Sequence, residues 1–446
     1  MGNTYNFLSN VYQETKQEIY KNKILVFILL VLLSIPLSYT INSICIFLLV
    51  FATGYFYKKN SFIFDKIMLL LIILYAIMLV SLIWTIDINR TIPALSKELS
   101  LLVIPICFLF FGTLSHQVKQ TIIKYYSNGI LLFCIFYLLK AAFRFALSQD
   151  INVFFYHELV TKDVNAIHVS VYVAIAFFYF FTKTIKTTFH YLAITVLLVM
   201  VFLLSSKNII VAFVGLIIIY HLFYSKLSKQ MRLKNLIVFV ILLFSLTFVG
   251  KIKDRFKEEY ETIMTDSTVN DVIKKGEGII YNVSIKQAWT NETFKPNDYF
   301  PGTAFRVYQF RVFLELLQQD QIFWTGYGLN ASYSKIVQKG TEHNVYLGEG
   351  AEEGYQKKNF HNQYIQNFAE LGVFGFLILV VMLVINLKNA LKNKDFIHIS
   401  FAVLMISLFL TESFLWRQRG VVFFTMMFCI FNSGIIFIKS KKINLQ

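Results

Sequence analysis

Long uninterrupted blocks of apolar residues constrain the fold of this chain more than any other feature. They lie near 24–39, 41–57, 67–85, 98–113, 128–146, 167–182, 189–204, 209–224, 235–250, 363–387, 396–413 and 421–438. An α-helix of about 20 apolar residues crosses a hydrocarbon core roughly 30 Å thick. Membrane β-barrels use shorter strands of alternating polarity, which these blocks do not resemble. The sequence therefore predicts an all-α, polytopic integral membrane protein with about twelve transmembrane helices.

The composition excludes several other classes of protein. Apolar residues make up 57% of the 446 positions, against roughly 45–50% in soluble domains. The net charge of +16 comes mostly from short basic runs between the blocks, which the charge asymmetry of a membrane explains better than nucleic-acid binding does. All four cysteines lie inside apolar blocks (Cys45, Cys107, Cys134 and Cys429). We expect no disulfide framework, no thiolate metal site and no nucleic-acid partner.

The basic residues also orient the chain. If the N-terminus lies inside, the inner connections contain most of the Lys and Arg residues, and the short outer connections contain few. The positive-inside rule then places both termini in the cytoplasm. This count divides the chain into nine spans over residues 1–250, one large outer loop over 251–360, and three further spans over 361–446.

The large loop contains segments that favour helices. A charged stretch over 251–260 is compatible with a helix leaving the membrane, and the run from Arg306 to Gln319 is amphipathic. In this second run Phe310, Phe313, Leu314 and Leu317 recur at helical spacing. Gly326-Tyr-Gly328 then indicates a turn. We therefore expect a partly helical loop.

The sharpest local pattern lies where this loop returns to the membrane. It reads His361-Asn-Gln-Tyr-Ile-Gln-Asn-Phe-Ala-Glu-Leu-Gly372-Val-Phe-Gly375. On a helix Gly372 and Gly375 share one face and allow another backbone to approach closely. A neutral imidazole at His361 can act as a base near neutral pH. The alternative is an interfacial histidine that caps a helix beside a packing face of small residues.

This segment resembles the signature of the O-antigen ligase and polymerase family. In that family a His, a polar residue, nine further residues and Gly-x-x-Gly begin a late transmembrane helix, and His361, Asn362, Gly372 and Gly375 fit the pattern completely. The large loop and the number of spans fit as well. The resemblance implies a glycosyltransferase of the bacterial inner membrane with its large loop in the periplasm. It also implies a glycan donor linked to undecaprenyl diphosphate, without a cofactor or a metal ion.

The resemblance further implies two cationic positions that hold the diphosphate. The family has an arginine in a loop helix before a glycine-rich turn. Arg311 matches it, with Arg306 as the second choice. An i,i+4 ion pair with Glu315 is the structural alternative for Arg311. Lys207 follows Ser206 where the family has Ser-Arg, so it keeps the charge but loses the planar fork of donors, and a snorkelling turn residue is the alternative.

Weaker patterns leave more than one interpretation open. Glu412, Trp416, Arg417 and Arg419 fall between the last two spans, where they either line the same cavity or end a helix. His157 and His168 flank a short outer loop, but no third ligand supports a metal site.

The implied reaction transfers a glycan to a sugar hydroxyl with inversion at the anomeric carbon. His361 would activate the acceptor, while Arg311 and Lys207 would stabilise the leaving diphosphate. The complete signature favours a ligase, whose acceptor is the lipid A–core oligosaccharide. A surface-polysaccharide polymerase with a glycan acceptor and a protein O-oligosaccharyltransferase are alternatives, and membrane lipids surround any of them. A lipid or solute transporter is the hypothesis from a different class. The lack of internal repeats and the low content of Pro and Gly argue against it.

Overall fold

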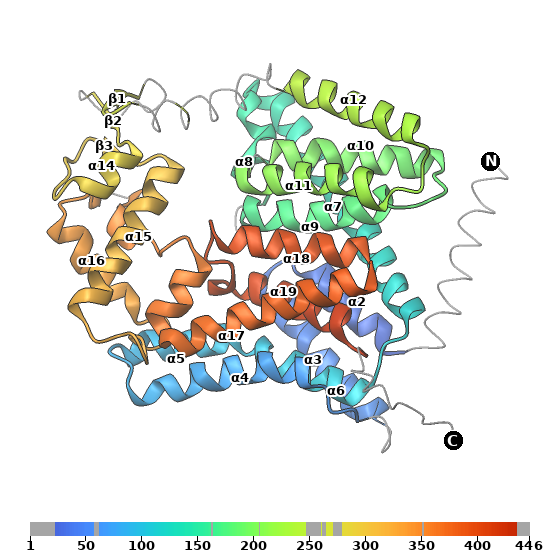
Figure 1. Cartoon of the computed structure of the whole chain (residues 1–446), viewed down its shortest axis with the longest axis horizontal. Helices are drawn as coiled ribbons and strands as arrows, with labels where there is room; N and C mark the ends of the chain where they lie inside the picture. Colours follow the sequence, from blue (N-terminus) through green and yellow to red (C-terminus); the bar gives the residue numbers. More distant parts are fainter. Residues whose placement is uncertain are drawn as a thin grey trace, which may run out of the picture.

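A computed structural model describes residues 23–57, 62–161, 164–204, 206–246, 260, 265–270, 279–349 and 352–434. The chain is mostly helical and has two parts (Figure 1). One is a bundle of apolar helices. The other, which we call the lobe, consists of the described residues of 265–360 and lies at one end of the bundle. The predicted helix over 251–260 lies outside the described residues except for Tyr260.

The bundle contains the helices of both the N-terminal and the C-terminal regions. The helices before the lobe are α2 (Ile24–Ser34), α3 (Tyr39–Phe56), α4 (Lys66–Val80), α5 (Ile88–Glu98), α6 (Ser100–Phe111), α7 (His116–Ser148), α8 (Tyr156–Leu159), α9 (Ala166–Phe181), α10 (Thr188–Leu203), α11 (Lys207–Ile219) and α12 (Lys229–Leu246). Those after it are α17 (Gln363–Asn393), α18 (Phe396–Phe409) and α19 (Gln418–Asn432). The short helical turns η1 (Ser81–Ile83), η2 (Ile151–Phe154), η3 (Tyr220–Tyr224) and η5 (Phe414–Trp416) lie between them.

Each apolar block that the sequence shows carries a helix in the described part of the chain. Six helical segments there are long and apolar enough to cross a membrane: 39–56, 66–83, 88–111, 116–148, 207–224 and 363–393. Shorter apolar helices cover 24–34, 166–181, 188–203 and 396–409. The protein is thus a multi-pass helical membrane protein, whereas the count of twelve crossings stays a prediction.

Helices α9 and α19 form the centre of the bundle. Nearly every residue of α9 from Ala166 to Phe180 is buried, and so is every residue of α19 from Arg419 to Asn432. A helix that is apolar on all sides is stable only where other helices surround it. The lipid-facing helices differ, because α3 and α7 expose large side chains such as Phe47, Phe51 and Leu139.

The lobe has a hydrophobic core of its own. Its helices are α14 (Ile285–Thr290), α15 (Gly302–Gln319) and α16 (Ser332–Glu342), followed by the turn η4 (Tyr355–Lys357). Five two-residue strands that the sequence did not predict accompany them: β1 (Thr268–Val269), β2 (Tyr281–Asn282), β3 (Asp298–Tyr299), β4 (Gly348–Glu349) and β5 (Glu352–Glu353). β2 pairs antiparallel with β1 and parallel with β3, and β4 pairs antiparallel with β5.

The predicted amphipathic helix is confirmed as α15, with one exception on its expected apolar face. Phe313 lies in the core of the lobe and Leu314 and Leu317 pack against it, whereas Phe310 is 42% exposed. The ring of Phe310 packs on Trp289 at the surface, with 6.2 Å between the ring centroids. Spacing within one helix cannot show such a neighbour from another segment.

A kink in α17 connects the lobe to the bundle. Gly372 leaves the helical conformation, with φ 65° and ψ −164°. The backbone of residues 322–328 fills the gap: the N–H groups of Tyr327 and Gly328 donate to the carbonyls of Ala369 and Glu370, both at 2.9 Å. The N–H of Val373 donates to the carbonyl of Phe323 at 2.8 Å. The kink thereby exposes backbone groups of α17 that the turn of the lobe satisfies.

This arrangement corrects the expected role of the two glycines. A Cβ atom at Gly372 would lie 2.1 Å from the carbonyl oxygen of Trp324, so another backbone does approach closely there. That backbone belongs to a turn of the lobe, and Gly372 itself is not helical. Gly375 has a different environment, because the nearest atoms to its Cβ position belong to Leu371 of the same helix. The two glycines therefore do not form one packing face for a second helix.

Candidate functional site

The connection between α18 and α19, which we call the 410–416 turn, is the point where the predicted site residues come together. Asn362, the N-cap of α17, accepts from the N–H groups of Tyr364 and Ile365 through Oδ1. Its Nδ2 donates to the carbonyl of Leu410 at 3.2 Å. A cap of this kind stabilises a helix by about 1 kcal/mol. Asn362 thus fixes the start of α17, and with it His361, against the turn.

His361 faces an acid of the same turn. Its Nδ1 lies 3.4 Å from Oε2 of Glu412. The backbone of His361 has a positive φ of 48°, and its N–H donates to Oδ1 of Asn359 at 3.0 Å. The ring of Phe305 meets the imidazole edge to face, with 5.5 Å between the centroids. The imidazole is held on three sides while 28% of the side chain stays exposed.

The environment of Glu412 favours its charged form despite burial. Only 5% of the side chain is exposed, and burial by itself raises the pKa of a carboxyl group. The hydrogen bond and charge of His361, together with His168 and Arg306, outweigh burial and lower the pKa of Glu412 to about 2. A carboxylate at Glu412 selects the tautomer of His361 that carries its proton on Nδ1. Nε2 is then left to accept a proton from a substrate.

Arg306 approaches the same turn from the lobe. Its Nε donates to the carbonyl of Thr411 at 2.9 Å, and its Nη1 donates to the carbonyl of Gly302 at 2.7 Å. Its Nη2 has no acceptor among the residues that the structure describes. The guanidinium is half-buried, so one face of its donor fork remains available to an anion.

Arg311 lies elsewhere, in an ion-pair network inside the lobe. Its Nε is 2.8 Å from Oε1 of Glu315, and its Nη1 donates to the carbonyl of Asn291 at 2.5 Å. Lys339 and His343 also reach Glu315, at 3.6 Å and 3.1 Å. The i,i+4 pair that competes with a phosphate-binding role is therefore formed. The structure does not bring Arg311 to His361.

Lys207 begins α11 next to a residue that contacts the turn directly. Asn208 donates through Nδ2 to Oγ1 of Thr411 at 2.8 Å and to the carbonyl of Ser407 at 2.6 Å. Oγ of Ser407 donates back to Oδ1 of Asn208 at 2.7 Å. These bonds anchor the first turn of α11 beside the 410–416 turn. Lys207, the first residue of α11, therefore lies near this turn.

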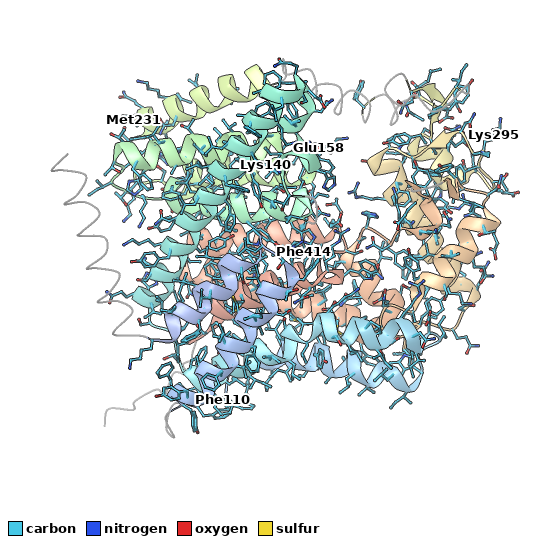
Figure 2. The ribbon with its side chains drawn as sticks, turned by 180° about the vertical axis from the view of Figure 1, so that it is seen from behind. Phe110, Lys140, Glu158, Met231, Lys295 and Phe414 are labelled. Carbon is cyan, nitrogen blue, oxygen red and sulfur yellow. The ribbon has the colours of Figure 1, made fainter. Side chains whose placement is uncertain are left out.

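The sequence indicated Glu412 as a candidate but not its pairing with His361, and it indicated no role for Thr411 or Asn208. Thr411 links α11 and α15, because its hydroxyl accepts from Asn208 and its carbonyl accepts from Arg306. A polar residue after Lys207, at the start of an apolar block, is the only sign of this in the sequence. Two residues after Glu412, Phe414 is fully buried in the bundle (Figure 2), and its ring packs 4.3 Å from that of His168. The turn is thus firmly anchored.

Residues 191–380 match a family model described as O-antigen ligase. Over these residues the chain is similar to the O-antigen ligase family. The matched O-antigen ligase region runs from α10 into α17 and contains Lys207, Arg306, Arg311 and His361. Glu412 lies outside it. A comparison with curated proteins finds no match.

This match supports the resemblance to O-antigen ligases that is seen in the sequence. A metal centre finds no support in the geometry, because the described residues contain no group of three or more His, Cys, Asp or Glu arranged to hold an ion. The ring of His168 packs on that of Phe414.

Proposed function

We propose that this protein transfers a glycan from undecaprenyl diphosphate to a sugar hydroxyl at the outer face of the bacterial inner membrane. The observation that carries the proposal is the His361–Glu412 pair, in the turn whose Thr411 carbonyl accepts from Arg306. His361 and Arg306 lie within the region that matches a family model described as O-antigen ligase. A partly exposed base, an ionised partner and a cation are the groups that such a transfer needs.

The chemistry follows from the roles of these groups. Nε2 of His361 takes the proton of the acceptor hydroxyl while Glu412 holds Nδ1–H and stabilises the imidazolium. The oxygen of the acceptor forms a bond to the anomeric carbon as the bond to the diphosphate breaks, so the configuration inverts. The diphosphate leaves with the electron pair. Cations near the leaving group stabilise the charge that develops on it.

Among the cations proposed from the sequence, we favour Arg306 and Lys207 for the diphosphate. Arg306 contacts the same turn as His361, and Lys207 precedes the residue that contacts Thr411. Arg311 already has Glu315 as a partner, so exchanging that ion pair for a phosphate would yield little free energy. We propose a supporting role for Arg311 inside the lobe. No cofactor or metal ion takes part in the proposed reaction.

For the acceptor, we propose the lipid A–core oligosaccharide, which makes the protein an O-antigen ligase in the strict sense. The complete His-Asn-x9-Gly-x-x-Gly spacing supports this choice. Polymerisation of lipid-linked repeats and transfer to a protein use the same chemistry at His361 and differ only in the acceptor. The proposed topology has twelve crossings, both termini in the cytoplasm and the lobe in the periplasm.

A glycolipid gel tests the function. The gene is deleted in the source bacterium and complemented with wild type, His361→Ala, or His116→Ala as the matched control. His116 is exposed at the N-terminus of α7, away from the 410–416 turn. We expect wild type and His116→Ala to restore the ladder of capped glycolipid, and His361→Ala to leave bare core with polymer stranded on the lipid carrier.

Each other outcome has a distinct meaning. Core capped by a single repeat upon deletion indicates a polymerase. An unchanged glycolipid upon deletion contradicts both activities and leaves a protein-directed transferase or a transporter. A normal ladder with His361→Ala contradicts the role assigned to His361.

A further inference from the structure

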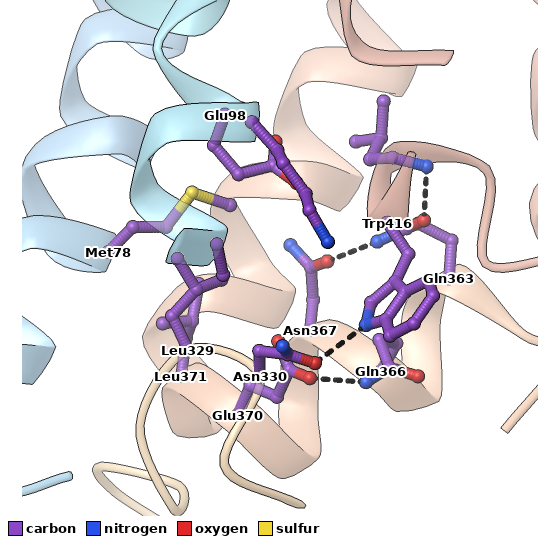
Figure 3. Close-up of a pocket in the computed structure, with 13 residues that line it drawn as sticks. Met78, Glu98, Leu329, Asn330, Gln363, Gln366, Asn367, Glu370, Leu371 and Trp416 are labelled. Carbon is purple, nitrogen blue, oxygen red and sulfur yellow. Dashed lines mark hydrogen bonds between the residues drawn. The ribbon is translucent and has the colours of Figure 1, made fainter. Parts of the chain in front are cut away.

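A second polar site lies on the other side of the 410–416 turn. It is a small cavity of about 20 Å³ that we call the Glu98 pocket, between the end of α5, the outer part of α17, Asn330 of the lobe and η5 (Figure 3). Trp416, four residues after Glu412, forms part of its wall. One turn therefore contributes Glu412 to the His361 site and Trp416 to this pocket.

The α17 wall of the pocket is an ordered polar stripe. Gln363, Gln366, Asn367 and Glu370 follow at helical spacing on one face of an otherwise apolar helix. Gln363 donates to Asn367 at 2.7 Å and accepts from the N–H of Leu415 at 2.7 Å. Gln366 donates to Glu370. Internal hydrogen bonds thus fix this wall before any ligand arrives.

Glu98 is the group in the pocket whose bonding is incomplete. Its residue is 5% exposed, and its Oε2 has no hydrogen-bond donor among the described residues. A buried polar atom without a partner is costly, so such an atom in a structure calls for a missing donor. A cavity of about 20 Å³ has room for one hydroxyl group or one water molecule. A hydroxyl group of a ligand, or of water in its absence, can supply the missing partner.

The other lining residues narrow the chemistry of the ligand. Two carboxyl groups, Glu98 and Glu370, stand against one ammonium group, Lys97, so a diphosphate is disfavoured. Lys97 is exposed, and its Nζ lies 5.4 Å from the centroid of the Trp416 ring, a positive charge that disfavours a metal cation. Nε1 of Trp416 donates to Oδ1 of Asn330 at 2.9 Å, which holds the half-buried indole in place. Acidic, basic and amide side chains beside a fixed aromatic ring suit an uncharged compound with several hydroxyl groups.

We propose that the Glu98 pocket is a subsite for one sugar residue of the transferred or accepting glycan. One hydroxyl of the sugar enters the cavity and donates to Glu98, while its ring lies outside, next to Trp416 and Lys97. This proposal rests on the proposed glycosyl transfer. It adds the place where the glycan is held while His361 acts on the other side of the turn.

Direct binding tests the subsite without requiring turnover. The oligosaccharide repeat is released by mild acid from the lipid-linked pool of the source cells and titrated against protein in nanodiscs. The background is His361→Ala, so that the glycan is not consumed. The variants are Glu98→Gln, which keeps the shape and replaces one carboxyl oxygen with an amide nitrogen, and Glu158→Gln as the matched control. Glu158 is an exposed acid that pairs with Arg144. Lys97→Ala is a second test at an exposed position where folding is not at risk.

We expect Glu98→Gln to weaken binding about tenfold, the effect of one lost hydrogen bond. Lys97→Ala should weaken it a few fold, and Glu158→Gln should leave it unchanged.

Binding that is absent in every variant, or equal in Glu98→Gln and the control, overturns the subsite even if transfer is observed. So does a density map in which an ordered water stays at Glu98 with the oligosaccharide bound. Glu98-dependent binding by a protein that performs no transfer supports the subsite and contradicts the proposed function. In an active protein, the KM for donor and the KM for acceptor, measured separately with Glu98→Gln, identify the glycan that occupies the pocket.

Discussion

Nδ1 of His361 lies 3.4 Å from Oε2 of Glu412, although the two residues are 51 positions apart in the sequence. His361 precedes the first residue of α17, and Glu412 lies in the turn after α18. The pair exists because α17 and α18 run antiparallel, which returns the chain to the end of the bundle where α17 began. The base and its orienting acid therefore depend on the packing of a helical hairpin.

Substitution of Glu412 tests this pair. We expect Glu412→Gln to lower kcat by about 10²-fold, within the range that positioned acid–base groups contribute, and to change KM by less than threefold. The amide cannot stabilise the imidazolium of His361. Steady-state transfer by the purified protein measures both constants. A rise in KM at unchanged kcat would show instead that Glu412 binds substrate.

The two arginines should respond differently to conservative substitution. Arg306→Lys removes the planar fork beside Thr411, and we expect about 10–100-fold lower kcat/KM, the effect of a lost charged hydrogen bond. Arg311→Lys disturbs a pair with Glu315 and should lower thermal stability more than activity. Transfer assays and melting curves on both variants show which arginine serves the reaction and which serves the stability of the lobe. The reverse pattern would return the diphosphate to Arg311.

The kink of α17 can be tested by adding one methyl group. Gly372→Ala places a Cβ 2.1 Å from the carbonyl oxygen of Trp324 and forces alanine to φ 65°. Strain of this kind costs about 1–3 kcal/mol before the steric clash is counted. We expect a lower melting temperature in detergent and a loosened lobe. Gly54→Ala in α3, where a Cβ meets nothing within 4 Å, is the control and should be neutral. Equal melting of the two variants would contradict the kink.

Acid should weaken the site in a defined pH window. Because the pKa of Glu412 is about 2 in the folded protein, below its ordinary value of 4.5, the ionised carboxylate stabilises the fold fully above about pH 4.5. This contribution is lost as the pH falls through the folded value. The difference in melting temperature between wild type and Glu412→Gln should hold steady above pH 5 and shrink below pH 4. A constant difference down to pH 3 would show that folding does not lower the pKa of Glu412.

The sequence predicted the helices well, because long apolar blocks have few alternatives in a membrane. It also predicted α15. It did not predict the exposure of Phe310, which depends on Trp289 of another helix. The non-helical Gly372 was missed as well, because the turn that displaces it arrives from residues 322–328.

Site residues were predictable as types, but most of their distant partners were not. The i,i+4 spacing offered Glu315 as a partner of Arg311, and the structure forms that pair. The contact of Arg306 with Thr411, 105 positions away, could not be read from the sequence. Similarly, Glu98 lies at the end of an amphipathic helix far from the family signature. Its pocket forms only when α5, α17 and η5 meet.

The helix that carries His361 at its start belongs to two cores at once. Ile365 and Ala369 pack in the core of the lobe, while Leu371 and Leu379 pack in the core of the bundle. Unfolding of either the lobe or the bundle would therefore disrupt α17, which contributes side chains to the core of the other part.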